Sequence, residues 1–239
     1  MIGMAGGHDI VFLLDVDNTL FDNDRFSHDL DARLLRDFGA DGRKRYRQHY
    51  QALRDAVGYA DYLGAVQRLR ADFDDDPDLL QLAAFILDYP FAEGLYPGAL
   101  DAVAHLHLHG MPAILSDGDI VLQPRKIQRS GLWQAVAGQV AITLHKQHET
   151  QDVQQRWPAG HYVMIEDKPL LLAQMKKLMG AQLTTVFIQQ GHYAVEQGLS
   201  PGDPAADIVL ARISDLRSLT ARDFIAAAAG PAVRHLEQP

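Results

Sequence analysis

Residues 9–20 read DIVFLLDVDNTL, an apolar run that ends in two carboxylates. The run from Ile10 to Leu14 is too short, and too rich in β-branched and aromatic residues, to form a helix of its own. It predicts a strand buried on both faces. Side chains alternate along an extended segment, so Asp15 and Asp17 leave the strand end on the same side. The sequence therefore predicts two acidic groups that face one small space at the carboxyl end of a buried strand.

Two carboxylates at this spacing repel each other, and each raises the proton affinity of the other unless a cation lies between them. Mg²⁺ takes oxygen ligands, usually one or two carboxylates together with water and substrate phosphate. Asp15 and Asp17 therefore point to a magnesium site. A solvated acidic loop is the alternative, because Asp22 and Asp24 follow at once. That alternative does not account for the hydroxyl of Thr19.

The composition restricts the class of protein. With 239 residues, 47% of them hydrophobic, the chain can bury a sizeable core, as one large domain or as a core with a smaller insertion. The net charge of −9 argues against a nucleic-acid partner, and the absence of cysteine excludes disulfides and thiolate ligands. No apolar run is long enough to span a bilayer and no secretory signal is evident, so we expect a cytoplasmic protein without a membrane partner. The oligomeric state stays open.

Residues 22–89 change character, with leucines, tyrosines and arginines at helical spacing and no strand pattern. This segment predicts a small helical bundle inserted after the first strand. The expected helices run from Ser27 to Gly39, from Asp41 to Gly58, from Asp61 onward and from Asp76 onward. The basic residues at positions 43–47 are expected to face solvent. As the alternative, one of them or Arg25 reaches the remote end of a substrate.

A second apolar strand, predicted over residues 112–115, ends at Ser116 and is followed by Asp117 and Gly118. A hydroxyl at a strand end, before a glycine turn into a helix, presents donors to an anion. A plain turn that caps a helix is the alternative. The pattern by itself leaves both interpretations of Ser116 and Asp117 open.

Two further strand ends carry charged side chains. Lys146 follows the apolar run of residues 140–144, and Glu166 and Asp167 follow that of residues 162–165. A lysine there brings positive charge over the rim of the sheet, and acids at a third strand end complete a magnesium site.

Strands that alternate with helices predict a Rossmann-like, three-layer α/β/α core with a parallel sheet of about five strands. In such sheets, ligands bind beyond the carboxyl ends of the strands. Asp15, Ser116, Lys146 and Asp167 each follow a separate apolar run. Four independent elements are therefore expected to deliver their side chains to one rim.

The segment from Asp15 to Thr19 resembles motif I, DxDxT, of the haloacid dehalogenase (HAD)-like hydrolase superfamily, in the form found in its phosphatases and phosphotransferases. Dehalogenases of the superfamily lack the second Asp, so Asp17 speaks against carbon–halogen chemistry. The resemblance covers residues 9–20 and 95–191. It implies a core formed by residues 1–21 and 93–239 and a helical cap formed by residues 22–92.

The resemblance also implies roles for individual residues. Asp15 would be the nucleophile and Asp17 the general acid and base, and both would help to bind Mg²⁺, Asp17 through its backbone carbonyl. Thr19 would brace this loop. The phosphate-binding residues would be Ser116, Asp117, Lys146 and Thr19, with Lys126 and Lys168 as lesser candidates for the lysine.

Two positions depart from the usual pattern of the superfamily. Lys146 matches the lysine of motif III of the superfamily by position, but Gln147 stands where a proline often follows that lysine. The motif IV acids Glu166 and Asp167 are adjacent, which leaves open the identity of the direct metal ligand. We favour Asp167, with Glu166 bound through water or placed behind it.

These implications predict a Mg²⁺-dependent phosphatase that hydrolyses a small phosphorylated metabolite through an aspartyl-phosphate on Asp15. A phosphotransferase or phosphomutase with the same residues is one alternative. A non-catalytic binding protein on the same scaffold is another.

Overall fold

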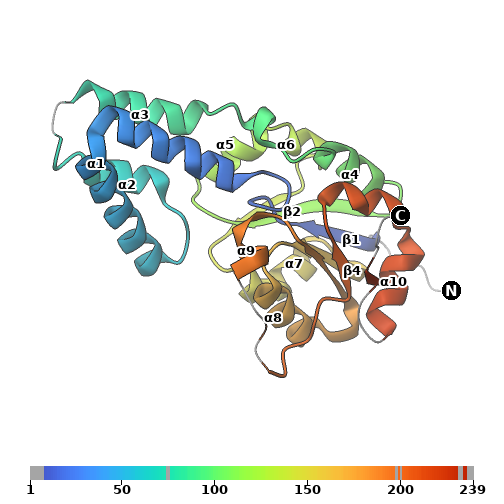
Figure 1. The fold of residues 1–239 in the computed structure, drawn as a ribbon. Helices are drawn as coiled ribbons and strands as arrows, with labels where there is room; N and C mark the ends of the chain where they lie inside the picture. Colours follow the sequence, from blue (N-terminus) through green and yellow to red (C-terminus); the bar gives the residue numbers. More distant parts are fainter. Residues whose placement is uncertain (1–7, 74–75, 197–198, 200, 231–233, 236–239) are drawn as a thin grey trace.

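The computed structural model describes residues 8–73, 76–196, 199, 201–230 and 234–235. Within this part of the chain, the strands form one parallel sheet in the order β3-β2-β1-β4-β5-β6-β7 (Figure 1). The strand bounds are β1 His8–Leu14, β2 Met111–Asp117, β3 Val140–Thr143, β4 Ala159–Glu166, β5 Leu183–Ile188, β6 Ile208–Leu210 and β7 Arg234–His235. The predicted parallel α/β fold is confirmed, and the described residues form seven strands where about five were expected.

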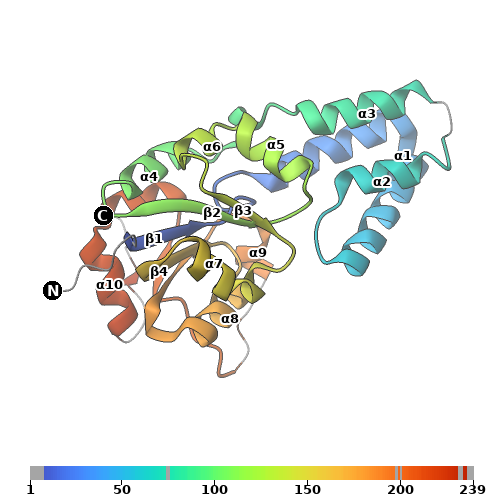
Figure 2. The ribbon, with the colours of Figure 1, turned by 180° about the vertical axis from the view of Figure 1, so that it is seen from behind.

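Helices cover both faces of the sheet (Figures 1 and 2). The helices that follow the helical insertion are α4 Ala99–Leu106, α5 Leu122–Arg129, α6 Leu132–Ala135, α7 Thr150–Arg156, α8 Pro169–Met179, α9 Gly191–Glu196 and α10 Ala221–Ala229. Short 3₁₀ turns lie at Phe91–Gly94, Lys146–His148, Gly180–Gln182 and Ile213–Ser218. Side chains of α4, α5, α6 and α10 share one apolar core, and those of α7 and α8 share a second. None of the described helices has the length and apolarity to cross a membrane.

Strand β1 lies in the middle of the sheet, between β2 and β4. Ile10, Phe12 and Leu14 face the first core, whereas Val11 and Leu13 face the second. All five side chains are buried, which confirms the predicted strand buried on both faces. Because β1 is central, the residues that follow it reach the middle of the rim.

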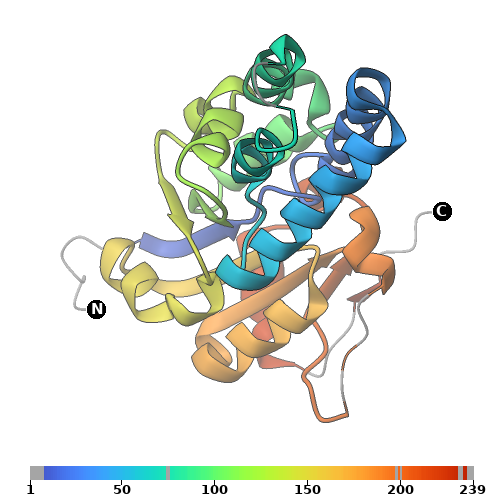
Figure 3. The same ribbon diagram turned by 90° about the vertical axis from the view of Figure 1, so that its left-hand side faces the viewer.

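The helical insertion packs beside the carboxyl edge of the sheet (Figure 3). It consists of α1 Asn23–Val57, α2 Tyr62–Leu69 and α3 Pro77–Asp88. Asp61 and Asp76 cap α2 and α3 as predicted, through hydrogen bonds of 2.7 Å from Gly64 N and 2.9 Å from Asp78 N. The two chain segments that lead into and out of the insertion lie side by side, with Phe21 bridged to Leu95. The boundaries predicted at residues 22 and 92 stay a prediction.

The start of α1 was predicted wrongly. Asp22, not Ser27, is the N-cap, and its carboxylate accepts a hydrogen bond of 2.9 Å from Arg25 N. The predicted end of the first helix at Gly39 is confirmed, because Gly39 has a non-helical backbone and α1 therefore consists of two helices joined at a kink. Gly39 adopts φ 67° and ψ −172° there, a conformation that glycine enters without a side-chain clash.

Candidate active site

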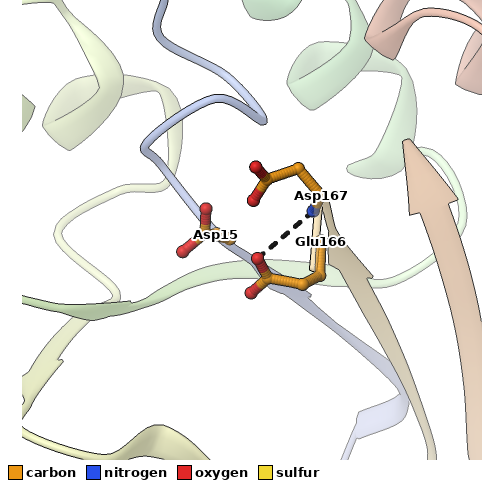
Figure 4. A group of neighbouring side chains, drawn as sticks. All are labelled: Asp15, Glu166 and Asp167. Carbon is orange, nitrogen blue, oxygen red and sulfur yellow. Dashed lines mark hydrogen bonds between the residues drawn. The ribbon is translucent and has the colours of Figure 1, made fainter. Parts of the chain in front are cut away.

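Three carboxylates meet at the carboxyl ends of β1 and β4 (Figure 4). Asp15, Glu166 and Asp167 each offer an oxygen atom, and these atoms all lie within 4.8 Å of one another. All three side chains are buried. The pairing of β1 with β4 brings them together, because Asp15 N donates to Ile165 O at 3.1 Å directly beside Glu166.

Lys146 extends from the turn after β3 into this acidic group. Its Nζ contacts Asp15 Oδ1 and lies 2.5 Å from Glu166 Oε2, and the lysine is fully buried. Burial alone would lower the pKa of Lys146, but the charges of Asp15 and Glu166 raise it above the ordinary value. The lysine therefore stays protonated and compensates part of the buried negative charge.

The three carboxylates differ in proton affinity. Burial and the charge of Glu166 raise the pKa of Asp167 to about 10, and the same two causes raise the pKa of Asp15. Burial would also raise the pKa of Glu166, but Lys146 and Lys168 hold that pKa below its usual value. Glu166 is therefore the ionised member, while Asp167 needs either a proton or a cation.

The donor set fits a divalent cation. Within the described residues, Asp15 Oδ2 and both carboxylate oxygens of Asp167 are buried without a hydrogen-bond partner. Buried carboxylate oxygens without partners are costly, and hard divalent cations take such oxygens as ligands. Glu166 Oε1, by contrast, accepts hydrogen bonds of 3.2 Å from the backbone N–H groups of Asp167 and Lys168. Asp167 is thus freer to bind a cation than Glu166 is.

Ser116 lies at the end of β2, beside the acidic group on the rim. It is buried, and its Oγ accepts a hydrogen bond of 2.9 Å from Gln123 Nε2 on α5. The carboxylate of the neighbouring Asp117 accepts from Thr143 Oγ1 at 2.7 Å and from Lys146 N at 2.8 Å. The side chain of Asp117 therefore braces the turn that carries Lys146.

Asp17 is not part of the acidic group, because its side chain turns toward α5. Lys126 Nζ donates to Asp17 Oδ1, and Gln123 Nε2 lies 3.4 Å from Asp17 Oδ2. Lys126 was a lesser candidate for the lysine beside the nucleophile, but that contact belongs to Lys146. Lys168, the other lesser candidate, is close enough to affect the pKa values of Asp15, Glu166 and Asp167.

The sequence prediction missed Gln123, which contacts both Asp17 and Ser116. The available signal was the spacing of Gln123 and Lys126, one helical turn apart on the face that also carries Leu122 and Ile127. Polar residues at inward positions of a helix that follows a predicted anion site are candidates for contact with that site.

The loop after β1 is braced by Asn18 rather than by Thr19. Asn18 adopts a left-handed conformation with φ 63°, and its Oδ1 accepts from the backbone N–H groups of Asn23 and Asp24 at 3.0 and 3.2 Å. The hydroxyl of Thr19 is buried and has no hydrogen-bond partner in the described part of the chain. Asn tolerates this backbone conformation better than most residues do.

Helix α9 joins the core to the insertion. His192 N donates to Asp24 Oδ2 at 2.8 Å, and His192 Nδ1 lies 2.5 Å from Asp24 Oδ1. Further along α1, Arg54 donates to the hydroxyl of Tyr193. Lys168 lies on the same tyrosine, with its Nζ 5.1 Å from the ring centroid. Tyr193 thus contacts both Arg54 of the insertion and Lys168, which directly follows Asp167 of the acidic group.

The arginines considered from the sequence do not occupy this position. In the insertion, their partners are carboxylates of α1 and of residue 72, as in the pairs Arg25–Asp29, Arg43–Asp31, Arg45–Asp72 and Arg47–Asp31. Lys44, Arg45 and Arg47 are exposed and Arg43 is half-buried, in agreement with the expectation that the basic residues at positions 43–47 face solvent.

Comparisons with known proteins identify the family. No protein-family model and no curated protein matches the chain. Among solved structures, a protein of Burkholderia xenovorans LB400 named as a haloacid dehalogenase-like hydrolase is 51% identical, over 90% of this chain and 98% of that one, with a TM-score of 0.83. The chain belongs to the haloacid dehalogenase-like hydrolase superfamily.

Other HAD structures share the fold at lower identity. The L-2-haloacid dehalogenase of Xanthobacter autotrophicus is 18% identical over 87% of this chain and 96% of that one, with a TM-score of 0.55. The magnesium-bound HAD hydrolase YfnB of Bacillus subtilis is 18% identical over 88% and 97%, with a TM-score of 0.58. The resemblance read from Asp15 to Thr19 is thus confirmed, and the protein is an enzyme of the HAD hydrolase superfamily.

Proposed function

We propose that this HAD-like hydrolase is a Mg²⁺-dependent phosphatase that hydrolyses a small phosphorylated metabolite. The observation that carries the proposal is the position of the Asp17 carboxylate. It follows Asp15 by two residues but lies outside the acidic group, bound to Lys126. A second carboxylate near the nucleophile and free of the cation is suited to proton transfer. Dehalogenation, by contrast, has no oxygen leaving group that needs a proton.

Asp15 is the proposed nucleophile. An oxygen of Asp15 attacks phosphorus and forms an aspartyl-phosphate, while the bond from phosphorus to the leaving oxygen breaks. Asp17 gives its proton to that oxygen. Asp17 then takes a proton from the water that attacks the aspartyl-phosphate, which releases inorganic phosphate and restores Asp15.

The remaining residues are proposed to bind the phosphoryl group and the cation. Lys146 contacts Asp15, and Ser116 presents a hydroxyl at the neighbouring strand end. Asp15, Asp167 and the backbone carbonyl of Asp17 would hold Mg²⁺, with Glu166 behind them. When bound, Mg²⁺ offsets the charge of the phosphoryl group and of the carboxylates. The proposed cap, residues 22–92, would exclude water during the first step and select the substrate.

The first experiment measures hydrolysis of p-nitrophenyl phosphate in Mg²⁺ and in EDTA. We expect turnover in Mg²⁺, no turnover in EDTA, and none for Asp15→Asn, whose fold is checked by circular dichroism. Full activity of Asp15→Asn would exclude the mechanism. Release of inorganic phosphate from a single monoester separates a phosphatase from a phosphotransferase.

A second assay compares phosphatase activity with carbon–halogen cleavage. Chloride release from 2-chloropropionate, without phosphate release from any monoester, would contradict the proposal and favour a dehalogenase. Inactivity on both classes of substrate would also contradict the proposed function.

A further inference from the structure

We infer that Lys126 is a positioning residue that holds the Asp17 carboxylate in place for proton transfer and connects it to the helical insertion. The inference rests on the proposed function, because it concerns the proton that Asp17 delivers. It adds a residue of α5 to a site whose other proposed residues lie at strand ends.

The contacts of Lys126 are specific. Its Nζ donates to Asp17 Oδ1 and, at 3.1 Å, to Asn23 Oδ1. Phe21 and Phe26 flank Asn23 in the sequence, and their ring centroids lie 5.0 and 5.8 Å from Lys126 Nζ. The lysine is only 1% exposed. A buried ammonium group is costly unless it is paired, so these contacts fix both its place and that of its partner.

Each carboxylate of the DVD segment has its own buried lysine. Lys146, from the turn after β3, contacts Asp15, and Lys126, from α5, contacts Asp17. The two lysines therefore keep the two carboxylates apart. One carboxylate stays with the acidic group at the strand ends, and the other stays outside it.

A second residue of α5 restrains the same carboxylate. Gln123 lies one turn before Lys126, and its Nε2 is 3.4 Å from Asp17 Oδ2 and 2.9 Å from Ser116 Oγ. Both oxygens of Asp17 thus face donors on one helix. This helix also contacts the strand end at which phosphate is proposed to bind. The rotation of the Asp17 side chain is limited relative to the phosphoryl group.

The contact with Asn23 links Lys126 to the insertion. Asn23 is the first residue of α1, and its Nδ2 donates to the hydroxyl of Tyr62 on α2 at 3.2 Å. A chain of polar contacts therefore runs from Asp17 through Lys126 and Asn23 to Tyr62. Movement of the insertion away from the sheet would withdraw one partner of Lys126 and loosen the Asp17 carboxylate.

The chemical step is the transfer of a proton from Asp17 to the leaving oxygen as the bond from phosphorus to that oxygen breaks. Lys126 acts only through the position of Asp17 and takes no part in the proton transfer itself. Its removal should therefore harm esters whose leaving oxygen needs a proton more than esters whose leaving group departs as a stable anion. General loss of structure would harm both classes alike.

The test compares kcat/KM for phenyl phosphate and p-nitrophenyl phosphate, assayed with Mg²⁺. We expect Lys126→Met to lower the value for phenyl phosphate about 100-fold and to raise the ratio of p-nitrophenyl to phenyl phosphate by about tenfold or more. In an Asp17→Asn background, the same substitution should leave the ratio unchanged, because the two residues act through one proton transfer.

Lys176→Met is the matched control. Lys176 forms an ion pair of 2.8 Å with Asp207. It lies on α8, a helix whose apolar side chains belong to the second core. We expect this variant to keep the wild-type ratio. If Lys126→Met does not fold, Gln123→Met removes the other donor on Asp17 and should raise the ratio by a smaller factor. An unchanged ratio in the folded variant overturns the inference.

The activity of the wild-type enzyme on the two esters separates failure of the proposed function from failure of this inference. If the wild type hydrolyses neither ester, crystal structures of the wild type and Lys126→Met decide the inference without an assay. An Asp17 carboxylate displaced from its wild-type position in the variant supports the positioning role. An Asp17 carboxylate in the same position overturns it.

Discussion

Lys146 Nζ lies 2.5 Å from Glu166 Oε2 and also contacts Asp15, so one buried ammonium group compensates two buried carboxylates. The third carboxylate, Asp167, has no hydrogen-bond partner within the described residues. The single positive charge of Lys146 is therefore smaller than the negative charge that three ionised carboxylates would carry. This imbalance leads to the predictions on stability, pH and cation binding that follow.

Replacement of Lys146 by methionine should destabilise the protein by about 3–5 kcal/mol, because it leaves Asp15 and Glu166 buried without their shared partner. Urea unfolding in EDTA measures the change. Lys177→Met is the control, because Lys177 pairs with Asp203 on the surface, with its side chain 54% exposed. The control should change the free energy of unfolding by about 1 kcal/mol or less. Equal effects of the two substitutions would contradict the prediction.

The metal-free protein should lose stability as pH rises from 7.5 to 9. The pKa of Asp167 is raised to about 10 in the folded state by burial and by Glu166, whereas its ordinary value is 3.8. Between these values the unfolded chain releases the proton and the folded chain keeps it. The free energy of unfolding therefore falls with pH, by at most about 1.4 kcal/mol per pH unit from this group.

Glu166 should not contribute to this slope, because its lowered pKa leaves it ionised in both states at pH 7.5 and above. Urea unfolding in EDTA at the two pH values measures the effect. Asp167→Asn supplies the control and should flatten the dependence. Stability that rises with pH in the wild type would refute the prediction.

Magnesium should stabilise the protein more at pH 9 than at pH 7.5, because the cation binds the ionised form of Asp167 and displaces its proton. The rise in Tm on addition of MgCl₂ to EDTA-treated protein measures this. Asp167→Asn should abolish the rise. Glu166→Gln should retain part of it, because Glu166 already bonds to Lys146 and to backbone N–H groups. The reverse order of the two variants would make Glu166 the direct ligand.

Loss of the Tyr193 hydroxyl should favour an open arrangement of the insertion, because Arg54 donates to that hydroxyl from α1. Hydrogen bonds to charged groups contribute about 1.5–3 kcal/mol, so Tyr193→Phe should raise the ratio of open to closed molecules about tenfold or more. The absence of native cysteine allows specific labelling at Leu80→Cys and Leu178→Cys, whose native side chains are 74% and 62% exposed.

Fluorescence energy transfer between these two labels reports the separation of α3 and α8. We expect lower transfer efficiency in Tyr193→Phe than in the labelled wild type. His105→Ala, which alters a hydrogen bond to Leu219 O within the core, is the control and should leave the efficiency unchanged. Unchanged transfer in Tyr193→Phe would show that the hydroxyl does not hold the insertion.

The order of strands and helices and the position of the chemical groups could be predicted from the chain alone. Asp15, Ser116 and Glu166 each end or follow an apolar run, and parallel strands end at a common edge. The starts of α2 and α3 were also predictable, because Asp61 and Asp76 cap them locally. The start of α1 was not, because Asn18 and Asp22 complete its first turn from a loop whose path depends on the sheet.

Local pattern thus determined the elements and the residues at their ends, since strand alternation and helix capping depend on neighbours in sequence. Tertiary structure alone decided the partners: Lys146 for Asp15, Lys126 for Asp17 and Tyr193 for Arg54. These pairs join residues far apart in the chain, and each depends on how the elements that carry them pack together. The raised pKa of Asp167 also depends on the tertiary structure, because packing buries its carboxyl group and places it beside the charge of Glu166.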